Sequence, residues 1–218
     1  MKAELIEVFG NDLMVVNAAR VSFDKKKEAL NKADAKLIRY LAENNHWSPF
    51  SHPKAQFRLT LPIFVARQWE KHRVGCVRGY DIYDQNEVSR RYVDSEPEFY
   101  MPTRWRSRPD GSVKQGSGDY VHPQTAKFCD QEYAAAIEGC EKAYNQLLRG
   151  GIAPEQARIV LPQSMMTSWI ETGSLAYWAR LVKQRTDPHA QQEVQELAAQ
   201  ISAAMAEYFP VSWAALMA

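Results

Sequence analysis

The chain has 218 residues, and its 27 Lys and Arg against 26 Asp and Glu give a formal net charge of +1. Hydrophobic residues at 45% and charged residues at 24% are ordinary globular values, which excludes an intrinsically disordered chain. The near-neutral charge argues against a dedicated duplex-DNA-binding protein, because such proteins usually carry a large basic excess.

The first predicted elements are a strand over residues 3–9 and a short helix that ends at Arg20. Asp12 is predicted to cap this helix, since its carboxylate can accept the free amides of a first turn. A second helix ends near Asn44 and carries four residues at helical spacing, namely Ala33, Leu37, Tyr40 and Leu41.

Residues 54–61 alternate without a break, which predicts a half-buried strand. Its apolar face consists of Ala55, Phe57, Leu59 and Leu61. Pro62 suits the first turn of a helix, where its missing amide costs nothing, so a helix is predicted from residue 62 to about 73. One flank of that helix is polar and indicates either a solvated face or a basic site: Arg67, Gln68, Lys71 and His72.

The second half of the chain is predicted to be mainly helical. Residues 74–85 indicate an irregular loop, and residues 97–123, rich in Pro, Gly, Ser and Arg, indicate a long surface excursion. The next predicted elements are a long helix over 124–148 and a short helix that carries Arg158. After a mixed segment through Thr172, helices are predicted over 175–184 and 189–208, and Pro210 ends the last of them. The predicted fold class is α+β, with one modest, largely antiparallel sheet wrapped by helices.

Features that the sequence lacks indicate its compartment and argue against a metal site. Three cysteines form no CxxC pair and are odd in number, which indicates a reducing compartment. No apolar run approaches the roughly 20 residues that span a bilayer. Residues 1–7 carry acids where a targeting peptide avoids them. No zinc-site spacing is present, because His46 and His52 lie six residues apart. We therefore expect one cytoplasmic domain over residues 1–218, without a metal.

The side chains left to carry chemistry are arginines in short clusters, because GxSxG, Walker A, HExxH and GxGxxG patterns are absent. A planar guanidinium donates two parallel hydrogen bonds, which suits phosphate and carboxylate oxygens. Arg158 stands out because its neighbours are apolar. If it is buried, its partner is either a structural acid or an anionic ligand.

Several strings along the chain together resemble one family. They include AARVSF at 18–23, HWSPFSH at 46–52, PIFVARQW at 62–69, NEVSRRY at 86–92 and ARIVLP at 157–162, with Arg185 and His189 beyond them. In this order they resemble the flavin-dependent thymidylate synthase family. The resemblance covers most of the chain and implies that family's fold.

The resemblance implies that the chain methylates dUMP at C5 to give dTMP. The carbon would come from methylenetetrahydrofolate and the reducing equivalents from NADPH through FAD. It implies that Arg185 is the catalytic residue against the pyrimidine, where a fixed guanidinium stabilises ring charge. Substrate binding is implied for Gln68, Lys71, Glu87, Ser89, Arg90, Arg91, Arg158 and Arg185. Cofactor binding is implied for His46, Ser48, Lys71, His72, Arg73 and Glu87.

The family's enzymes are homotetramers with sites between subunits, so the resemblance implies a homotetramer in which Gln68 and Lys71 come from a neighbouring subunit. The implied partner is a pyrimidine deoxynucleotide, with neither nucleic acid nor membrane.

This chain departs from the family pattern at four places. Lys71 stands where an arginine is usual, which keeps the charge but loses the fork. The loop at 74–85 is longer than usual. Ser174-Leu175-Ala176 replaces an Asn-x-Arg string that binds FAD. Arg180 replaces an asparagine on the same helical face as Ala176, so it either restores the lost cation toward FAD or faces solvent.

These departures leave alternatives open. One keeps the fold but changes the reaction, to dCMP methylation or to hydroxymethylation of a pyrimidine nucleotide with weakened or no flavin dependence. Another is a nucleic-acid-binding protein that uses the basic and aromatic residues 104–108 with Lys114. A third is a catalytically silent partner subunit, against which the retained Arg91, Arg158 and Arg185 argue.

Overall fold

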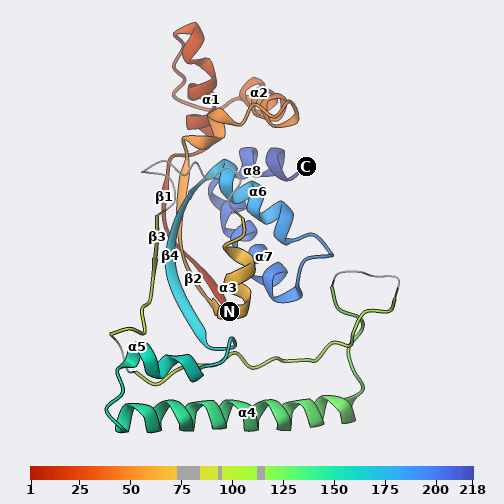
Figure 1. Ribbon diagram of the computed structural model, residues 1–218. Coiled ribbons are helices and arrows are strands. Elements are labelled where there is room, and N and C mark those ends of the chain that lie inside the picture. Colours follow the sequence, from red (N-terminus) through yellow and green to blue (C-terminus); the bar gives the residue numbers. More distant parts are fainter. Residues whose placement is uncertain (73–83, 93–94, 112–115) are drawn as a thin grey trace. The chain divides into compact units, whose positions relative to one another are not determined.

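The computed structural model describes residues 1–72, 84–92, 95–111 and 116–218 (Figure 1). Its described strands form one sheet in the order β1-β2-β4-β3, with β1 at Lys2–Phe9, β2 at Lys54–Pro62, β3 at Asp84–Glu87 and β4 at Met166–Ser174. The sheet is antiparallel and the class is α+β, as the sequence predicts. The described part holds no helix both long and apolar enough to cross a membrane.

The chain divides into two compact units. Unit 1 contains Met1, Thr60–Gln68 and Glu87–Ser168; unit 2 contains Lys2–Leu59, Trp69–Asn86 and Trp169–Ala218. Strands β2 and β4 each run from one unit into the other, since their sequences cross these boundaries.

Strand β2 confirms the prediction from alternation. Ala55, Phe57, Leu59 and Leu61 are each at most 1% exposed, because successive side chains of a strand point to opposite faces of the sheet.

Strand β4 is an element that the sequence pattern did not reveal. Its buried positions include Thr167, Trp169, Glu171 and Gly173, so the inward face mixes polar and apolar residues. An alternation of hydrophobicity is therefore missing, although the alternation of burial is regular.

Unit 2 is mainly helical. Its helices are α1 (Asp12–Arg20), α2 (Lys32–Glu43), α6 (Leu175–Arg185), α7 (Gln192–Tyr208) and α8 (Pro210–Met217), with short 3₁₀ turns η1 (Val21–Phe23) and η2 (Ser48–Ser51). Helix α7 contacts β1 and α6, and α2 contacts α8. The core includes Ile38, Trp178 and Phe209, each fully buried.

The capping prediction for α1 is wrong. Asn11 is the N-cap, and its side chain accepts the amides of Leu13 and Met14. Asp12 is buried, and its two carboxylate oxygens accept the amides of Val211 at 2.9 Å and Ser212 at 2.8 Å. Asp12 thus caps α8, a helix that the sequence missed because Pro210 was interpreted as an end, whereas it occupies a first turn.

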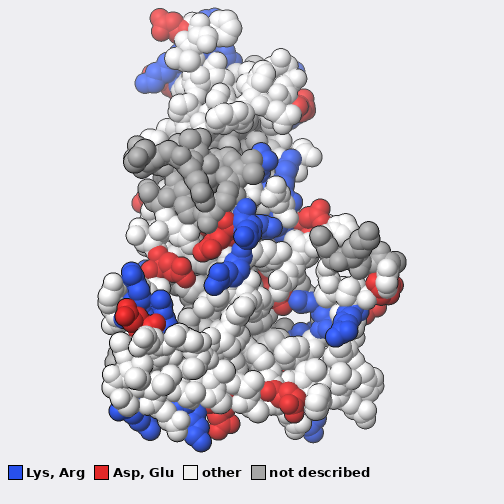
Figure 2. All heavy atoms as spheres, viewed as in Figure 1, with Lys and Arg blue, Asp and Glu red and all other residues white. Residues whose placement is uncertain are grey.

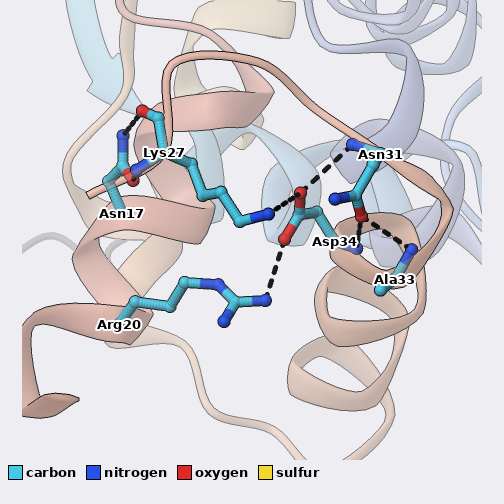
Figure 3. A network of polar contacts seen from close by, with 6 residues as sticks. All are labelled: Asn17, Arg20, Lys27, Asn31, Ala33 and Asp34. Atoms are coloured by element: carbon cyan, nitrogen blue, oxygen red, sulfur yellow. Dashed lines mark hydrogen bonds and ion pairs between the residues drawn. The ribbon is translucent and has the colours of Figure 1, made fainter. Parts of the chain in front are cut away.

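A polar network fastens the segment between α1 and α2 (Figure 3). The fully buried Asp34 accepts from Arg20 Nη2 at 2.8 Å and from the Asn31 amide at 3.1 Å, and pairs with Lys27 Nζ at 3.8 Å. Asn17 bonds the backbone of Lys27 in both directions. Asp34 is therefore the anchor of this end of α2.

Unit 1 contains the longest helix, α4 (Pro123–Arg149), where the sequence predicts it, followed by α5 (Pro154–Ala157) and η3 (Arg158–Val160). Helix α4 contacts α5 and η3. Among the described residues of the predicted excursion, pairing is limited to isolated bridges, Phe99 with Met165 and Arg106 with Tyr120.

Helix α3 (Ile63–Trp69) is shorter than predicted. Pro62 is the last residue of β2, and a turn in which the Trp69 carbonyl accepts the His72 amide at 3.0 Å follows the helix. Lys71 and His72 therefore do not share a helical flank with Arg67.

Candidate functional site

Unit 1 contains a cavity of about 860 Å³, here called the unit 1 cavity. Five of the predicted substrate-binding residues line it: Glu87, Ser89, Arg90, Arg91 and Arg158. Glu87 ends β3, the next three follow it along the chain, and Arg158 is the first residue of η3. Residues far apart in sequence are thus brought to one place, as the resemblance implies.

Hydrogen bonds fix part of this lining. Thr167 Oγ1 donates to Glu87 Oε1 at 2.6 Å. Arg90 donates to the carbonyls of Ser95 at 2.6 Å and Glu96 at 3.1 Å, so its guanidinium clamps the backbone. The cavity wall at Glu87, Arg90, Ser95 and Glu96 is therefore held partly by the side chains expected to bind the ligand.

Arg91 and Arg158 keep most of their donors available. Arg91 Nε donates to Ser89 Oγ at 3.2 Å, and Arg158 Nε donates to the Glu155 carbonyl at 3.2 Å. Both side chains are exposed, so Arg158 is not a buried cation that needs a structural acid as its partner. In the described part of the chain neither forms an ion pair, which leaves both forks free for an anionic ligand.

The unit 1 cavity also holds acids, which decides how it can select a ligand. Its charged lining residues are Arg67, Arg90, Arg91 and Arg158 against Glu87, Glu96, Glu98 and Glu155. These formal charges balance, so an anion would be recognised by the geometry of individual guanidinium groups rather than by an overall positive potential.

Unit 2 contains a larger cavity of about 1060 Å³, here called the unit 2 cavity. Aromatic residues Trp47, Phe50 and Tyr177 line it together with three cations, Lys54, Arg180 and Lys183. Its described lining includes no Asp or Glu. The cavity thus combines apolar rings with uncompensated positive charge, a lining that suits a ligand with an aromatic part and an anionic part.

Arg180 and Ala176 both line the unit 2 cavity, which confirms that they share one face of α6. Arg180 is exposed and at the same time lines the cavity.

His72 is buried beside this cavity. Its Nδ1 lies 2.9 Å from Gln184 Oε1, and Gln184 lines the cavity. Because an amide oxygen only accepts, Nδ1 carries the proton and Nε2 is an acceptor. Nε2 is buried without a hydrogen-bond partner among the described residues. Burial lowers the pKa of His72, and Arg185 and Arg180 lower it further against the opposing Gln184 bond, so the ring is neutral near pH 7.

Arg185, the predicted catalytic residue, ends α6 in unit 2 and is half-buried. Burial lowers the pKa of its guanidinium, which nevertheless stays charged. It belongs to a different unit from Arg91 and Arg158, and it does not line the unit 1 cavity.

The remaining predicted residues are scattered. His46 is exposed, with its ring edge-on to Tyr40 at 5.9 Å, and Ser48 begins η2. Gln68 is half-buried in α3, and Lys71 is exposed. Arg73 and the loop residues 74–83 lie outside the described residues.

Two buried residues near the unit 2 cavity were not predicted, namely Tyr177, which lines it, and Glu171, which accepts the Tyr177 hydroxyl. Glu171 lies at an inward position of β4, where a charged residue is rare. That signal becomes visible only once β4 is known to be a strand.

Charge on the face drawn in Figure 2 is mixed, with small groups of Lys and Arg next to Asp and Glu. This mixture is consistent with the net charge of +1.

Comparison with known proteins gives one consistent family. The sequence profile described as "Thymidylate synthase complementing protein" matches residues 4–211. The "Flavin-dependent thymidylate synthase" of Kosmotoga olearia is 37% identical over 217 residues, covering 98% of this chain and 88% of that protein. A protein of the same name from Thermus thermophilus is 34% identical, covering 97% of this chain and 73% of that protein.

Solved structures agree with the sequence relatives. The UMP/dUMP methylase PolB from Streptomyces cacaoi, bound with 5-Br dUMP, superposes with a TM-score of 0.85 at 30% identity, covering 98% of this chain and 93% of that chain. Its complex with 5-Br UMP gives 0.82.

Proposed function

The chain belongs to the thymidylate synthase complementing protein family, and on this basis we propose that it is a flavin-dependent thymidylate synthase. It methylates dUMP at C5, with methylenetetrahydrofolate as carbon donor and NADPH through FAD as reductant. The relatives and the methylase neighbour do not favour the alternative reactions on dCMP or with a hydroxymethyl product. The observation that carries the proposal is the unit 1 cavity, which gathers Arg91 and Arg158 with free forks.

The unit 1 cavity is proposed to bind the nucleotide. Arg91 and Arg158 hold the phosphate, because each fork can donate two parallel hydrogen bonds to it. Ser89 and Glu87 offer a hydroxyl and a carboxylate to the sugar or base. Arg90 contributes by fixing the wall, since its N–H groups bond the carbonyls of Ser95 and Glu96.

The residues of unit 2 fit FAD. The cations Arg180 and Lys183 suit its diphosphate, and the rings of Trp47, Phe50 and Tyr177 suit its aromatic parts. The buried Nε2 of His72 is an acceptor without a partner among the described residues, and it could accept an N–H group of the cofactor. Bound FAD carries reducing equivalents from NADPH to the one-carbon group. His46, Ser48, Lys71, Arg73 and Glu87 stay predictions as further FAD contacts.

Arg185 is proposed to act on the pyrimidine. As negative charge grows on the N3 and O4 side of uracil, C5 becomes nucleophilic, and a guanidinium fixed there stabilises that charge without a proton transfer. Its partial burial strengthens the interaction, because the effective dielectric constant is lower than in water. No thiol is needed to attack the ring.

A homotetramer is proposed to complete the sites, with Gln68 and Lys71 from a neighbouring subunit. The exposure of α4 supports assembly: along its 27 residues only Tyr144 is buried, and Phe128 is 60% exposed. The proposal also includes a cytoplasmic location and a single functional domain over residues 1–218.

The proposal is tested by incubating the purified protein with FAD, NADPH, methylenetetrahydrofolate and, in turn, dUMP, UMP and dCMP, and by measuring product masses. We expect a methylated product from dUMP and a flavin absorption spectrum that shifts on binding. A hydroxymethyl product, or turnover of dCMP alone, contradicts the proposal.

A matched pair of variants tests the unit 1 cavity. Arg158→Ala removes one free fork, and we expect KM for dUMP to rise at least tenfold, because a charge-assisted hydrogen bond contributes about 1.5–3 kcal/mol. Arg149→Ala, an exposed arginine at the end of α4 outside both cavities, should leave KM unchanged. An equal change in KM for both variants would show that Arg158 does not bind the phosphate.

A further inference from the structure

A carboxylate is buried in unit 2 next to the unit 2 cavity. Glu171 is 0% exposed, and its Oε2 accepts the indole N–H of Trp169 at 2.8 Å and of Trp69 at 3.1 Å. Its Oε1 accepts the hydroxyl of Tyr177. Burying a carboxylate costs free energy, so a strand that only had to fill this space would carry an apolar side chain. A buried acid that accepts three oriented side-chain donors can hold those side chains in place.

Tyr177 is fixed from several sides. Its amide donates to Ser174 Oγ at 3.1 Å in the first turn of α6, and its ring lies edge-on to Trp178 at 5.0 Å between centroids. A Cβ at Gly173 would overlap ring carbon Cδ1 of Tyr177, so residue 173 must lack a side chain for the ring to lie where it does. Strand β4 thus supplies both the acceptor and the gap.

The Tyr177 ring in turn contacts the imidazole ring of His72. The two ring centroids are 5.5 Å apart and the planes are tilted by 53°. His72 is 3% exposed, and Tyr177 and Gln184, its two contacts on α6, both line the unit 2 cavity. The charged groups that act on the imidazole are Arg180 and Arg185, also on α6.

We propose that Glu171 is a positioning residue of the unit 2 cavity: through its hydrogen bond to Tyr177 it fixes the tyrosine ring, and through that ring the imidazole of His72, in the arrangement that binds the cofactor. The identity of the ligand as FAD rests on the proposed function. The positioning of His72 by Glu171 and Tyr177 does not depend on the proposed function, because every contact from Glu171 to His72 lies within the protein.

Three variants break this arrangement at different points. Tyr177→Phe removes the hydroxyl but keeps the ring, Glu171→Gln keeps the shape but accepts on one side only, and Gly173→Ala displaces the ring without touching Glu171. Tyr144→Phe is the matched control, because Tyr144 is fully buried in α4 and its hydroxyl has no hydrogen-bond partner among the described residues.

Two readouts are used. The Kd of FAD, from quenching of flavin fluorescence, should rise about tenfold in each of the three variants, which corresponds to 1.4 kcal/mol. The pKa of His72, from NMR of the histidine-labelled protein without FAD, should rise toward 6.5 as the ring becomes more solvated. Its resonance is identified by its loss in His72→Asn. Tyr144→Phe should change neither.

Each outcome decides the question. If Tyr177→Phe leaves both the FAD Kd and the His72 pKa at wild-type values, the proposal is wrong. If Glu171→Gln lowers only the melting temperature, Glu171 has a structural role alone. If the wild-type protein does not bind FAD, the proposed function fails, and the His72 pKa in the variants still decides whether Glu171 positions the imidazole. Should Glu171→Gln not fold, Tyr177→Phe and Gly173→Ala carry the test.

Discussion

We propose that Arg180 compensates for a cation that this chain lacks at position 176. Ala176 stands where the family has an arginine, and Arg180 lines the same cavity one helical turn later. We therefore predict that Arg180→Ala weakens FAD binding by about ten- to a hundredfold, since a hydrogen bond to a charged group contributes about 1.5–3 kcal/mol. Equilibrium titration of FAD, followed by its absorbance, measures the effect.

The control for Arg180 uses the same cavity. Ala176→Arg in the Arg180→Ala background returns a guanidinium to the earlier turn and should restore part of the affinity. Unchanged FAD affinity in Arg180→Ala would show that the other cations, Lys54 and Lys183, are sufficient.

His72 makes stability depend on pH. Its folded pKa lies below its usual value of 6.5 because the ring is buried. Between these two values the unfolded chain binds a proton that the folded chain does not, so the free energy of unfolding decreases as pH falls below about 6.5. Urea denaturation at pH 5 and pH 7 should show this loss, and His72→Gln should show less of it. An identical pH dependence in wild type and variant would mean that His72 does not contribute.

At the residue scale, the sequence could supply residue types but not surroundings. Arg91, Arg158, Ser89 and Glu87 were predicted from strings that resemble a family, and the fold places them in one cavity. Whether Arg158 is buried could not be predicted, because apolar neighbours in sequence do not determine which side of a short 3₁₀ turn faces the protein.

At the scale of elements, Asp12 joins the two ends of unit 2. Its carboxylate caps α8 from α1 and is buried. We predict that Asp12→Ala lowers the free energy of unfolding by about 2 kcal/mol, because two amides of the first turn of α8 lose their acceptor in a buried place. The melting temperature should fall by about 4–8 °C.

Asn11→Ala is the comparison for Asp12→Ala. Asn11 caps α1 itself in an exposed setting, where water can replace the lost acceptor, so a cost of about 1 kcal/mol is expected. Calorimetry of both variants distinguishes the two roles. A larger effect of Asn11→Ala would mean that the contact between Asp12 and α8 is weak.

Elements with a single clear period were predictable and mixed ones were not. Strand β2 alternates in hydrophobicity, and α4 has an uninterrupted helical sequence between Pro123 and Gly150, so both were predicted. Strand β4 was missed because it buries Thr167 and Glu171 for their hydrogen bonds. Thr167 and Glu171, which interrupt the hydrophobic alternation of β4, form hydrogen bonds with residues that line the two cavities.

At the scale of the whole molecule, we propose that ligand binding is divided between two cavities of different electrostatic character. The unit 1 cavity balances four arginines with four glutamates, whereas the described lining of the unit 2 cavity has cations without acids. The first suits selection by hydrogen-bond geometry, as a nucleotide requires, and the second suits a highly charged cofactor.

The proposed homotetramer can be tested through helix α4. Helix α4 turns Ala126, Cys129, Tyr133, Ile137, Cys140 and Tyr144 toward the rest of unit 1, and its opposite face exposes Phe128 together with Ala135 and Gly139. An exposed phenylalanine on this otherwise polar and small-residue face offers an apolar contact to another surface. Four copies of 24.9 kDa weigh about 100 kDa, and we expect this mass by light scattering.

Phe128→Asp should shift the protein toward smaller species and reduce dUMP turnover in parallel, since sites shared between subunits are lost with the assembly. A 24.9 kDa wild-type protein with full activity would contradict the shared-site proposal.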